Sequence, residues 1–110
     1  MRAKASCVKK PKKIVCGDCY RFAVQEAQQP YEVTVVHGTV TDPWSGKRFS
    51  HAWVERDDKA YDWQMVHIRD QAPQPIDDYY RIWKPKDITR YPGVKSVVMM
   101  VRHGHFGPWK

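Results

Sequence analysis

The chain of 110 residues is long enough for one small domain. A hydrophobic content of 42% and an aromatic content of 13% exclude an intrinsically disordered chain and favour a folded core. The net charge is +7, yet residues 1–13 hold six of the 19 basic residues and none of the acids, so the remainder is close to neutral. No apolar run approaches the ~20 residues of a membrane span, and no hydrophobic signal segment follows the basic start. We therefore expect a cytoplasmic protein without membrane contact.

These properties divide the chain into two parts. We expect residues 1–13 to be a disordered basic tail and residues 14–110 to form a single α+β domain. The tail has two possible interpretations: it is a solvated segment, or its positive charge binds nucleic acid or an acidic partner. An odd number of cysteines, three, argues against a disulfide framework. We expect no cofactor and no bound metal.

The first expected element is a helix over residues 18–28. Gly17 allows a turn and Asp18 is a good N-cap, and the helix is expected to end before Pro30. Apolar periodicity and turn residues place the later elements. These are strands at 33–41, 49–56, 60–66 and 87–91, with a bulge at Gly38, a turn at 42–46 and a loop at 69–75, and helices at 76–83 and 92–102, the last capped by Gly104.

The strands at 49–56 and 60–66 are expected to form an antiparallel hairpin. A tip at Arg56 and Asp57 would place His51 directly opposite Asp62. Opposite residues share one face of a sheet, with Cβ atoms about 5 Å apart, so the register predicts a carboxylate beside an imidazole. A slip of one residue would break this contact.

Cys19 falls in the first turn of the expected helix. Unpaired backbone N–H groups and the helix macrodipole favour a thiolate there, which suits a nucleophile. Cys16, just before the helix, is the alternative candidate for the nucleophile. The spacing Cys16-Gly-Asp-Cys19 also fits a redox pair or half of a zinc site, although no further cysteines or spaced histidines complete a tetrahedral set. A small buried core residue is the remaining alternative.

Cys19, His51 and Asp62 together form a nucleophile, a general base and an orienting acid. They occur in three motifs: Gly17-x-Cys19-x-x-x-Ala23, His51-Ala-Trp-Val-Glu55 and the strand residue Asp62. In this order the motifs resemble the transglutaminase-like branch of the papain-like cysteine-protease superfamily. The runs at 36–40 and 105–109 are similar to small phage and bacterial proteins of that type.

The resemblance implies a papain-like or transglutaminase-like core over residues 14–110. In such a core a helix carrying the cysteine packs on an antiparallel β-meander, and a C-terminal helix completes the domain. It also implies a thiol hydrolase with a Cys-His-Asp triad, but it supplies no substrate.

Further residues are candidates for binding and for stabilising charge. The backbone N–H of Cys19 is the expected oxyanion donor, and Gln64, on the same face as Asp62, is a second candidate. Trp44 in the turn is a candidate substrate contact, and Trp53 would help to keep water from His51.

Three further histidines are expected to be structural. His37, on the neighbouring strand, is expected in the core or on the surface. His103 and His105 are spaced as if for a metal, but a C-terminal packing segment, ending with Trp109 docked on the sheet, explains them better.

Two functions are therefore expected. The first is a cysteine hydrolase or acyl transferase acting on an amide or ester bond, with a peptide or another amide as substrate. The second is a non-catalytic binding or accessory protein on the same fold, whose basic tail contacts nucleic acid or an acidic partner.

Overall fold

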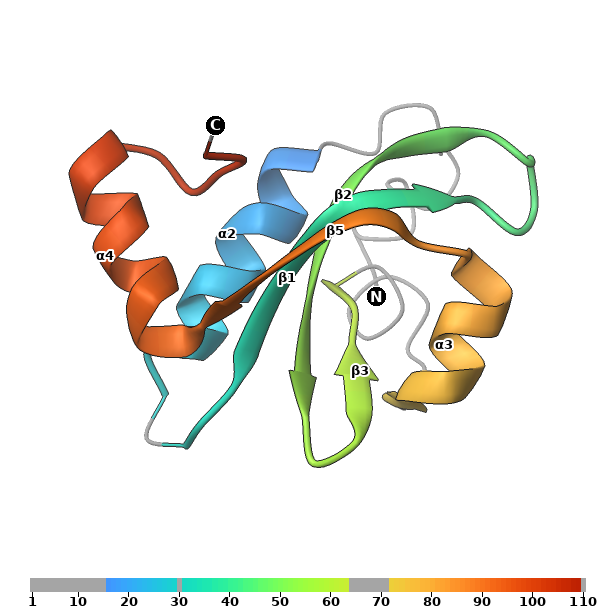
Figure 1. Cartoon of the computed structure of the whole chain (residues 1–110), viewed down its shortest axis with the longest axis horizontal. Coiled ribbons are helices and arrows are strands. Elements are labelled where there is room, and N and C mark those ends of the chain that lie inside the picture. The colour runs from blue at the N-terminus through green and yellow to red at the C-terminus, as the bar shows by residue number, and fades with distance from the viewer. Residues whose placement is uncertain (1–15, 30, 64–71, 110) are drawn as a thin grey trace, which may run out of the picture.

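The computed structural model describes residues 16–29, 31–63 and 72–109. The expected tail, Gln64 and residues 65–66 of the expected strand at 60–66 lie outside these ranges. Within them this strand is wrong at Asp62 and Trp63, because it ends at Tyr61. The described residues form a small α+β domain with three helices and a five-stranded antiparallel sheet (Figure 1). None of these helices is both long enough and apolar enough to span a membrane.

The helices and strands follow one another along the chain as α2 (Cys16–Ala27), β1 (Thr34–Thr41), β2 (Arg48–Arg56), β3 (Lys59–Tyr61), β4 (Gln74–Pro75), α3 (Ile76–Trp83), β5 (Lys86–Pro92) and α4 (Gly93–His103). In the sheet the strands lie in the order β4-β3-β2-β1-β5, so β5 returns to pair with β1. The antiparallel meander and the helices at 76–83 and 92–102 are confirmed. The loop expected at 69–75 is wrong at its end, where Gln74 and Pro75 pair with β3.

The two faces of the sheet are covered by different helices. Val35 and Val54 pack with α2 in one buried cluster, whereas Val36 and Trp53 pack with α3 in another. This division follows from the alternation of side chains along a strand. The sequence has no leucine, and valines with aromatic rings fill both clusters.

The register of the β2–β3 hairpin differs from the expected one by two residues. Arg56 pairs with Lys59, and the tip is Asp57–Asp58, both with positive φ, at 55° and 64°. A two-residue hairpin turn needs positive φ at both central positions, and aspartate adopts it more readily than arginine. Because the shift is an even number of residues, every side chain keeps its expected face.

The start of α2 also differs from the expected one. The helix begins at Cys16, so Asp18 lies inside the helix and is not its N-cap, and Cys16 is not outside it. Cys19 is the fourth residue of α2 and remains within the first turn or so. At the other end the helix stops at Ala27, close to the expected boundary.

The expected bulge at Gly38 is confirmed on one side of β1. The pairing of β1 with β5 shifts register between His37 and Thr39, whereas the pairing with β2 continues through Gly38. A Cβ atom at Gly38 would lie 3.0 Å from the backbone oxygen of Lys86, so glycine allows the close approach of β5.

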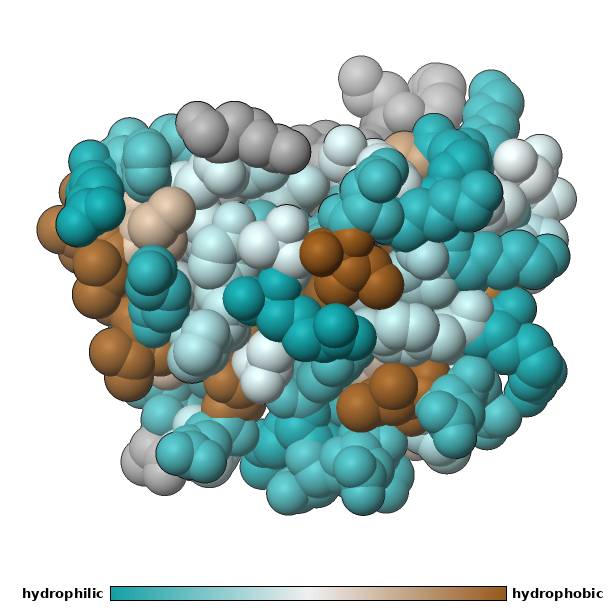
Figure 2. Space-filling model, viewed as in Figure 1, coloured by the Kyte–Doolittle hydropathy of each residue, from teal (hydrophilic) through white to brown (hydrophobic). Residues whose placement is uncertain are grey.

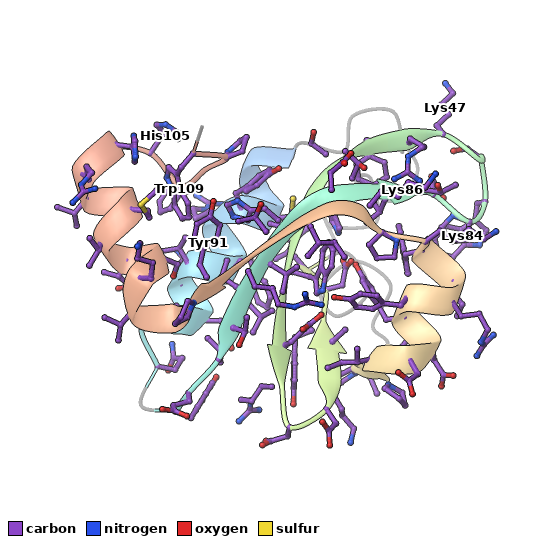
Figure 3. All side chains as sticks on the ribbon, viewed as in Figure 1. Lys47, Lys84, Lys86, Tyr91, His105 and Trp109 are labelled. Atoms are coloured by element: carbon purple, nitrogen blue, oxygen red, sulfur yellow. The ribbon has the colours of Figure 1, made fainter. Side chains whose placement is uncertain are left out.

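The C-terminal segment docks on the α2 face of the sheet, as expected. Trp109 is buried and lies against His37 and Tyr91, with ring centroids 4.9 and 5.1 Å away (Figure 3). Its indole N–H donates to the backbone oxygen of His105 at 2.9 Å. Gly104, with φ of 76°, caps α4 as expected.

Candidate active site

The centre of the candidate site is a buried pair, His51 and Asp62. His51 lies on β2 and Asp62 directly follows β3, and both are almost fully buried, with 0% and 1% exposure. Nε2 of His51 is 2.7 Å from Oδ2 of Asp62. The expected contact therefore forms, although the register differs. Tyr61 pairs with Val54, so Asp62, the next residue, is not directly opposite His51.

A third group shares the same carboxylate oxygen. The Tyr79 hydroxyl, from α3, donates a hydrogen bond to Oδ2 of Asp62. Burial raises the pKa of Tyr79 well above its usual value, and the charge of Asp62 and the hydrogen bond to it raise this pKa further. Tyr79 therefore stays protonated and remains a donor, which leaves Asp62 as the acceptor for both neighbours.

This arrangement fixes the roles of the two nitrogens of His51. With Asp62 ionised, Nε2 carries the proton and donates a hydrogen bond to the carboxylate. Nδ1 is buried and has no hydrogen-bond partner within the described ranges, so its lone pair is open to accept a proton. A buried polar atom without a partner is uncommon, and a catalytic role and a bound water are among its ordinary explanations.

Aromatic rings surround the imidazole. Trp83 of α3 stacks nearly parallel to it, with a centroid distance of 6.0 Å and an interplanar angle of 14°. Trp53, two residues further along β2, has its ring centroid 6.1 Å from that of His51. Phe49, two residues earlier, meets the imidazole edge-on at a centroid distance of 5.2 Å. These rings lower the local dielectric, so the charge interactions within the pair are stronger than in water.

Cys19 is buried in the α2-face cluster, with 1% exposure. A charge interaction with Cys19 adds to the raised pKa of the Tyr79 hydroxyl, after burial and Asp62, which places Cys19 near that hydroxyl. Its sulfur is not hydrogen-bonded to Nδ1 of His51, so the structure brings together His51 and Asp62 in direct contact, with Cys19 nearby.

The members of the candidate site come from both faces of the sheet. Among the described residues, β3 pairs with β2 only from Val54 to Arg56, and Asp62 directly follows β3. Cys19 belongs to the buried cluster on the α2 face, whereas Tyr79 belongs to the cluster on the α3 face.

The other expected site residues have different positions. Trp44 is 56% exposed in the turn, with its ring edge-on to Trp83 at 5.9 Å, so the most exposed indole here is separated from His51 by one ring. Trp53 is fully buried and donates to Glu55 at 3.1 Å. Gln64 lies outside the described residues.

Glu55 belongs to a second polar network beside the pair. Its Oε2 accepts hydrogen bonds from the indole of Trp53 and from the hydroxyl of Tyr80, the latter at 2.6 Å. Arg90 donates to the same hydroxyl at 2.7 Å. Burial and the hydrogen bond to Glu55 raise the pKa of Tyr80 to about 12.

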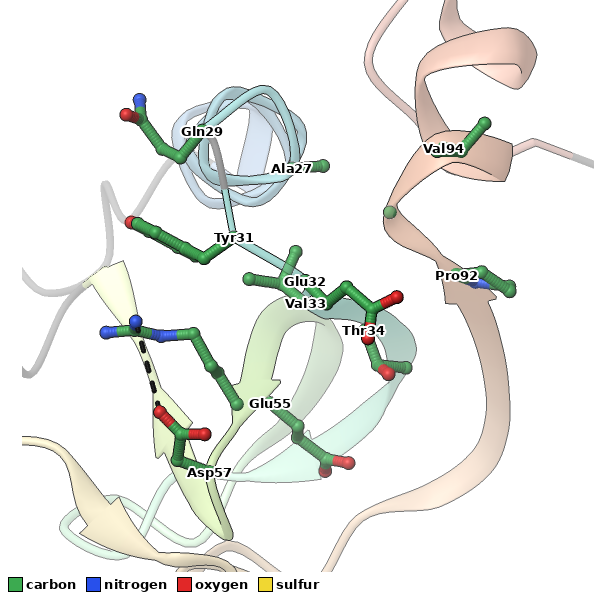
Figure 4. A pocket seen from close by; sticks show the side chains of 12 residues that line it. Ala27, Gln29, Tyr31, Glu32, Val33, Thr34, Glu55, Asp57, Pro92 and Val94 are labelled. Carbon is green, nitrogen blue, oxygen red and sulfur yellow. Dashed lines mark ion pairs between the residues drawn. The ribbon is translucent and has the colours of Figure 1, made fainter.

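A surface hollow of about 640 Å³ lies at the other end of α2 (Figure 4). It is bounded by the end of α2, the start of β1, the β2–β3 hairpin and the start of α4. Tyr31, Glu55 and the Arg56–Asp57 ion pair, 4.0 Å apart, lie on its wall. Cys19, His51 and Asp62 do not line it, so this hollow and the buried pair are separate.

The remaining histidines do not form a metal site in the described structure. The rings of His103 and His105 lie 6.1 Å apart, and no group of three or more metal-binding side chains gathers within residues 16–29, 31–63 and 72–109. His37 packs among the rings of Tyr20, Tyr91 and Trp109, which is the core role expected for it.

Comparison of the chain with protein-family models, curated proteins and solved structures yields no match. The resemblance to papain-like proteins therefore depends on the sequence motifs alone.

Sequence reasoning missed Tyr79 and Trp83 as members of the site. Both lie on the apolar stripe of the expected helix at 76–83, four residues apart, and the sequence pattern gave them no role beyond that helix. A hydroxyl on the buried stripe of a helix needs a polar partner, and that requirement was the available signal. The identity of the partner depends on how α3 crosses the sheet, which no local pattern encodes.

Proposed function

We propose that the protein is a cysteine hydrolase or acyl transferase acting on an amide or ester bond. The observation that carries the proposal is the buried His51–Asp62 hydrogen bond of 2.7 Å, which leaves Nδ1 of His51 open to accept a proton. Cys19 lies near Tyr79, the residue that bonds the same carboxylate, and this supports Cys19 as the nucleophile.

The reaction follows from these roles. Nδ1 of His51 takes the proton from Cys19, and the thiolate forms a bond to the substrate carbonyl carbon. The carbonyl–nitrogen bond breaks, the amine leaves with the proton from His51, and a thioester remains. Water or a second amine then attacks the thioester, His51 takes its proton, and the proton returns to the sulfur as the C–S bond breaks.

The same proposal includes a papain-like or transglutaminase-like core. A cysteine near the start of a helix, a histidine on the strand packed with it and an acid after the next strand follow the order of that superfamily. Supporting this, α2 packs on β2, and Asp62 follows the strand paired with β2. A peptide or another amide is the substrate class that fits this chemistry.

The test is selective alkylation of Cys19. At pH 6 a free cysteine with a pKa of about 8.5 is almost wholly a thiol, so iodoacetamide should label Cys19 faster than Cys7, as read by peptide mass spectrometry. We expect His51→Gln to slow the labelling of Cys19 by about tenfold or more, and to leave Cys7 unchanged. Equal labelling of Cys19 and Cys7 in the wild type would overturn the proposal.

One observation favours the alternative, a non-catalytic binding protein. Cys19 and His51 are almost fully buried, and the surface hollow lies away from them. In that case the basic residues 1–13 would contact nucleic acid or an acidic partner. Removing residues 1–13 should then abolish retention on a heparin column at low salt, while the labelling of Cys19 at pH 6 stays as slow as that of a free thiol.

A further inference from the structure

α3 contributes two side chains to the His51–Asp62 pair from one face. Tyr79 donates to the carboxylate of Asp62, and Trp83, one turn later, stacks on the imidazole of His51. Residues four apart on a helix point in the same direction, so a single rigid element contacts both members of the pair. Tyr79 and Trp83 are themselves almost fully buried, with 0% and 1% exposure.

From this geometry we infer that Tyr79 is a positioning residue for the proposed site, which sets how strongly Asp62 supports His51. The inference rests on the proposed function. Both donors converge on one oxygen, Oδ2, so Tyr79 shares the negative charge that Asp62 offers to His51. The hydroxyl thus fixes the orientation of the carboxylate and also moderates its effect on the imidazole.

The hydroxyl can fill this role across the whole working pH range. Burial, followed by the charge of Asp62 and the hydrogen bond to it, raises the pKa of Tyr79 well above its usual value. Tyr79 therefore neither loses its proton nor becomes a competing base. It acts only through Asp62, which distinguishes it from a catalytic group that touches the substrate.

Trp83 completes the arrangement by limiting the motion of the imidazole. Its ring lies nearly parallel to that of His51, so the imidazole cannot rotate away from Asp62 without losing the stack. The indole nitrogen of Trp83 has no hydrogen-bond partner within the described ranges. Trp83 thus contacts the site by packing against the rings of His51 and Tyr79, with centroid distances of 6.0 and 5.7 Å.

The chain offers a matched pair of variants for the test. Tyr79→Phe removes the hydroxyl that bonds Asp62, whereas Tyr80→Phe removes the neighbouring hydroxyl, which bonds Glu55. Both changes keep the ring and alter the same helix. Any general weakening of α3 should therefore affect both variants, and a specific effect should appear only in Tyr79→Phe.

Two measurements separate the outcomes. In Tyr79→Phe, Asp62 offers more of its charge to His51, so we expect the proton resonance of the His51 Nε2–H to move downfield in NMR spectra. We also expect the acid limb of the Cys19 alkylation profile to move to lower pH by about half a unit to one unit, because a better stabilised imidazolium favours the thiolate. Tyr80→Phe should match the wild type in both.

The inference is overturned if the resonance and the acid limb of Tyr79→Phe match those of the wild type, or if both variants change alike. Trp83→Leu should broaden the His51 resonances without moving the acid limb. If wild-type Cys19 reacts no faster than Cys7, the proposed function fails. The NMR measurement still decides whether Tyr79 acts on the His51–Asp62 pair, because it requires no activity.

Discussion

At the scale of single residues, Asp62 is the group on which the site depends most. Its Oδ2 is the acceptor for the imidazole of His51 and the hydroxyl of Tyr79, and all three side chains are buried. A buried donor that loses its acceptor keeps the full penalty of its desolvation. Asp62 therefore has a structural role in addition to the role proposed for it in catalysis.

This dual role predicts different effects for two substitutions. We expect Asp62→Ala to lower the free energy of unfolding by about 2–4 kcal/mol, because it leaves two buried donors without an acceptor. Asp62→Asn should cost less, since its amide oxygen still accepts one hydrogen bond. Urea unfolding measures both, with Asp77→Ala, an exposed acid at the start of α3, as a control expected to change by less than about 1 kcal/mol. Equal losses for Ala and Asn would contradict the hydrogen-bond explanation.

At the scale of elements, α3 joins the two polar networks of the protein. Consecutive tyrosines on this helix reach different acids, Tyr79 bonding Asp62 and Tyr80 bonding Glu55. Both tyrosines have a raised pKa, chiefly because of burial. The helix therefore links its own docking on the sheet to the protonation of two hydroxyl groups.

That link predicts a loss of stability in alkaline solution. An unfolded tyrosine loses its proton near pH 10, whereas folded Tyr80 keeps its proton to about pH 12. Above pH 10 the unfolded state binds fewer protons than the folded state, so stability is complete below pH 10 and falls as the pH rises toward 12. We expect the urea midpoint to fall over this window, and to fall less steeply in Tyr79→Phe and in Tyr80→Phe. Slopes identical to the wild type in both variants would refute this.

The elements themselves were largely predictable from sequence. The helix at 76–83 has apolar residues at helical spacing, and β1 and β2 are rich in valine and aromatic residues, so local signals agree with the final structure. The hairpin register was missed by two residues because hydrophobic alternation has a period of two and does not distinguish such shifts. The requirement for positive φ at Asp57 and Asp58 was the signal that could have corrected it.

The candidate site was predictable only in part, for a related reason. The contact between His51 and Asp62 depends on the face of each side chain, which survives an even shift of register. The contact of Tyr79 with Asp62 and the stacking of Trp83 depend on how α3 crosses the sheet. That placement is set by β4 and by packing between distant segments, so it could not be read from local patterns.

At the scale of the whole molecule, the outer surfaces of the two ends differ in character. The C-terminal segment covers His37 and Tyr91 on the α2 face. Beside it, α4 exposes valines at positions 94, 98 and 101, which form the apolar area over that helix in Figure 2. The opposite end carries Lys47 just before β2, Lys84 just after α3 and Lys86 at the start of β5 (Figure 3).

The C-terminal segment depends on a glycine at its closest approach to the core. Gly107 has φ of 126°, and a Cβ atom there would lie 2.8 Å from the ring of His37. We expect Gly107→Ala to lower the free energy of unfolding by about 1–3 kcal/mol, from backbone strain and displacement of the segment. Gly104→Ala is the control, since its φ is also positive but a Cβ would meet nothing within 4 Å. Urea unfolding should show a smaller loss for Gly104→Ala, of about 1 kcal/mol. The reverse order would contradict the proposed contact.

The stacking of His51 against two indoles has an optical consequence. A protonated imidazole quenches the emission of a tryptophan beside it, and the ring centroids of Trp53 and Trp83 lie 6.1 and 6.0 Å from that of His51. Trp109 lies beside another histidine, His37, so the difference between the fluorescence titrations of the wild type and His51→Gln would report the charge on His51 without any label or substrate.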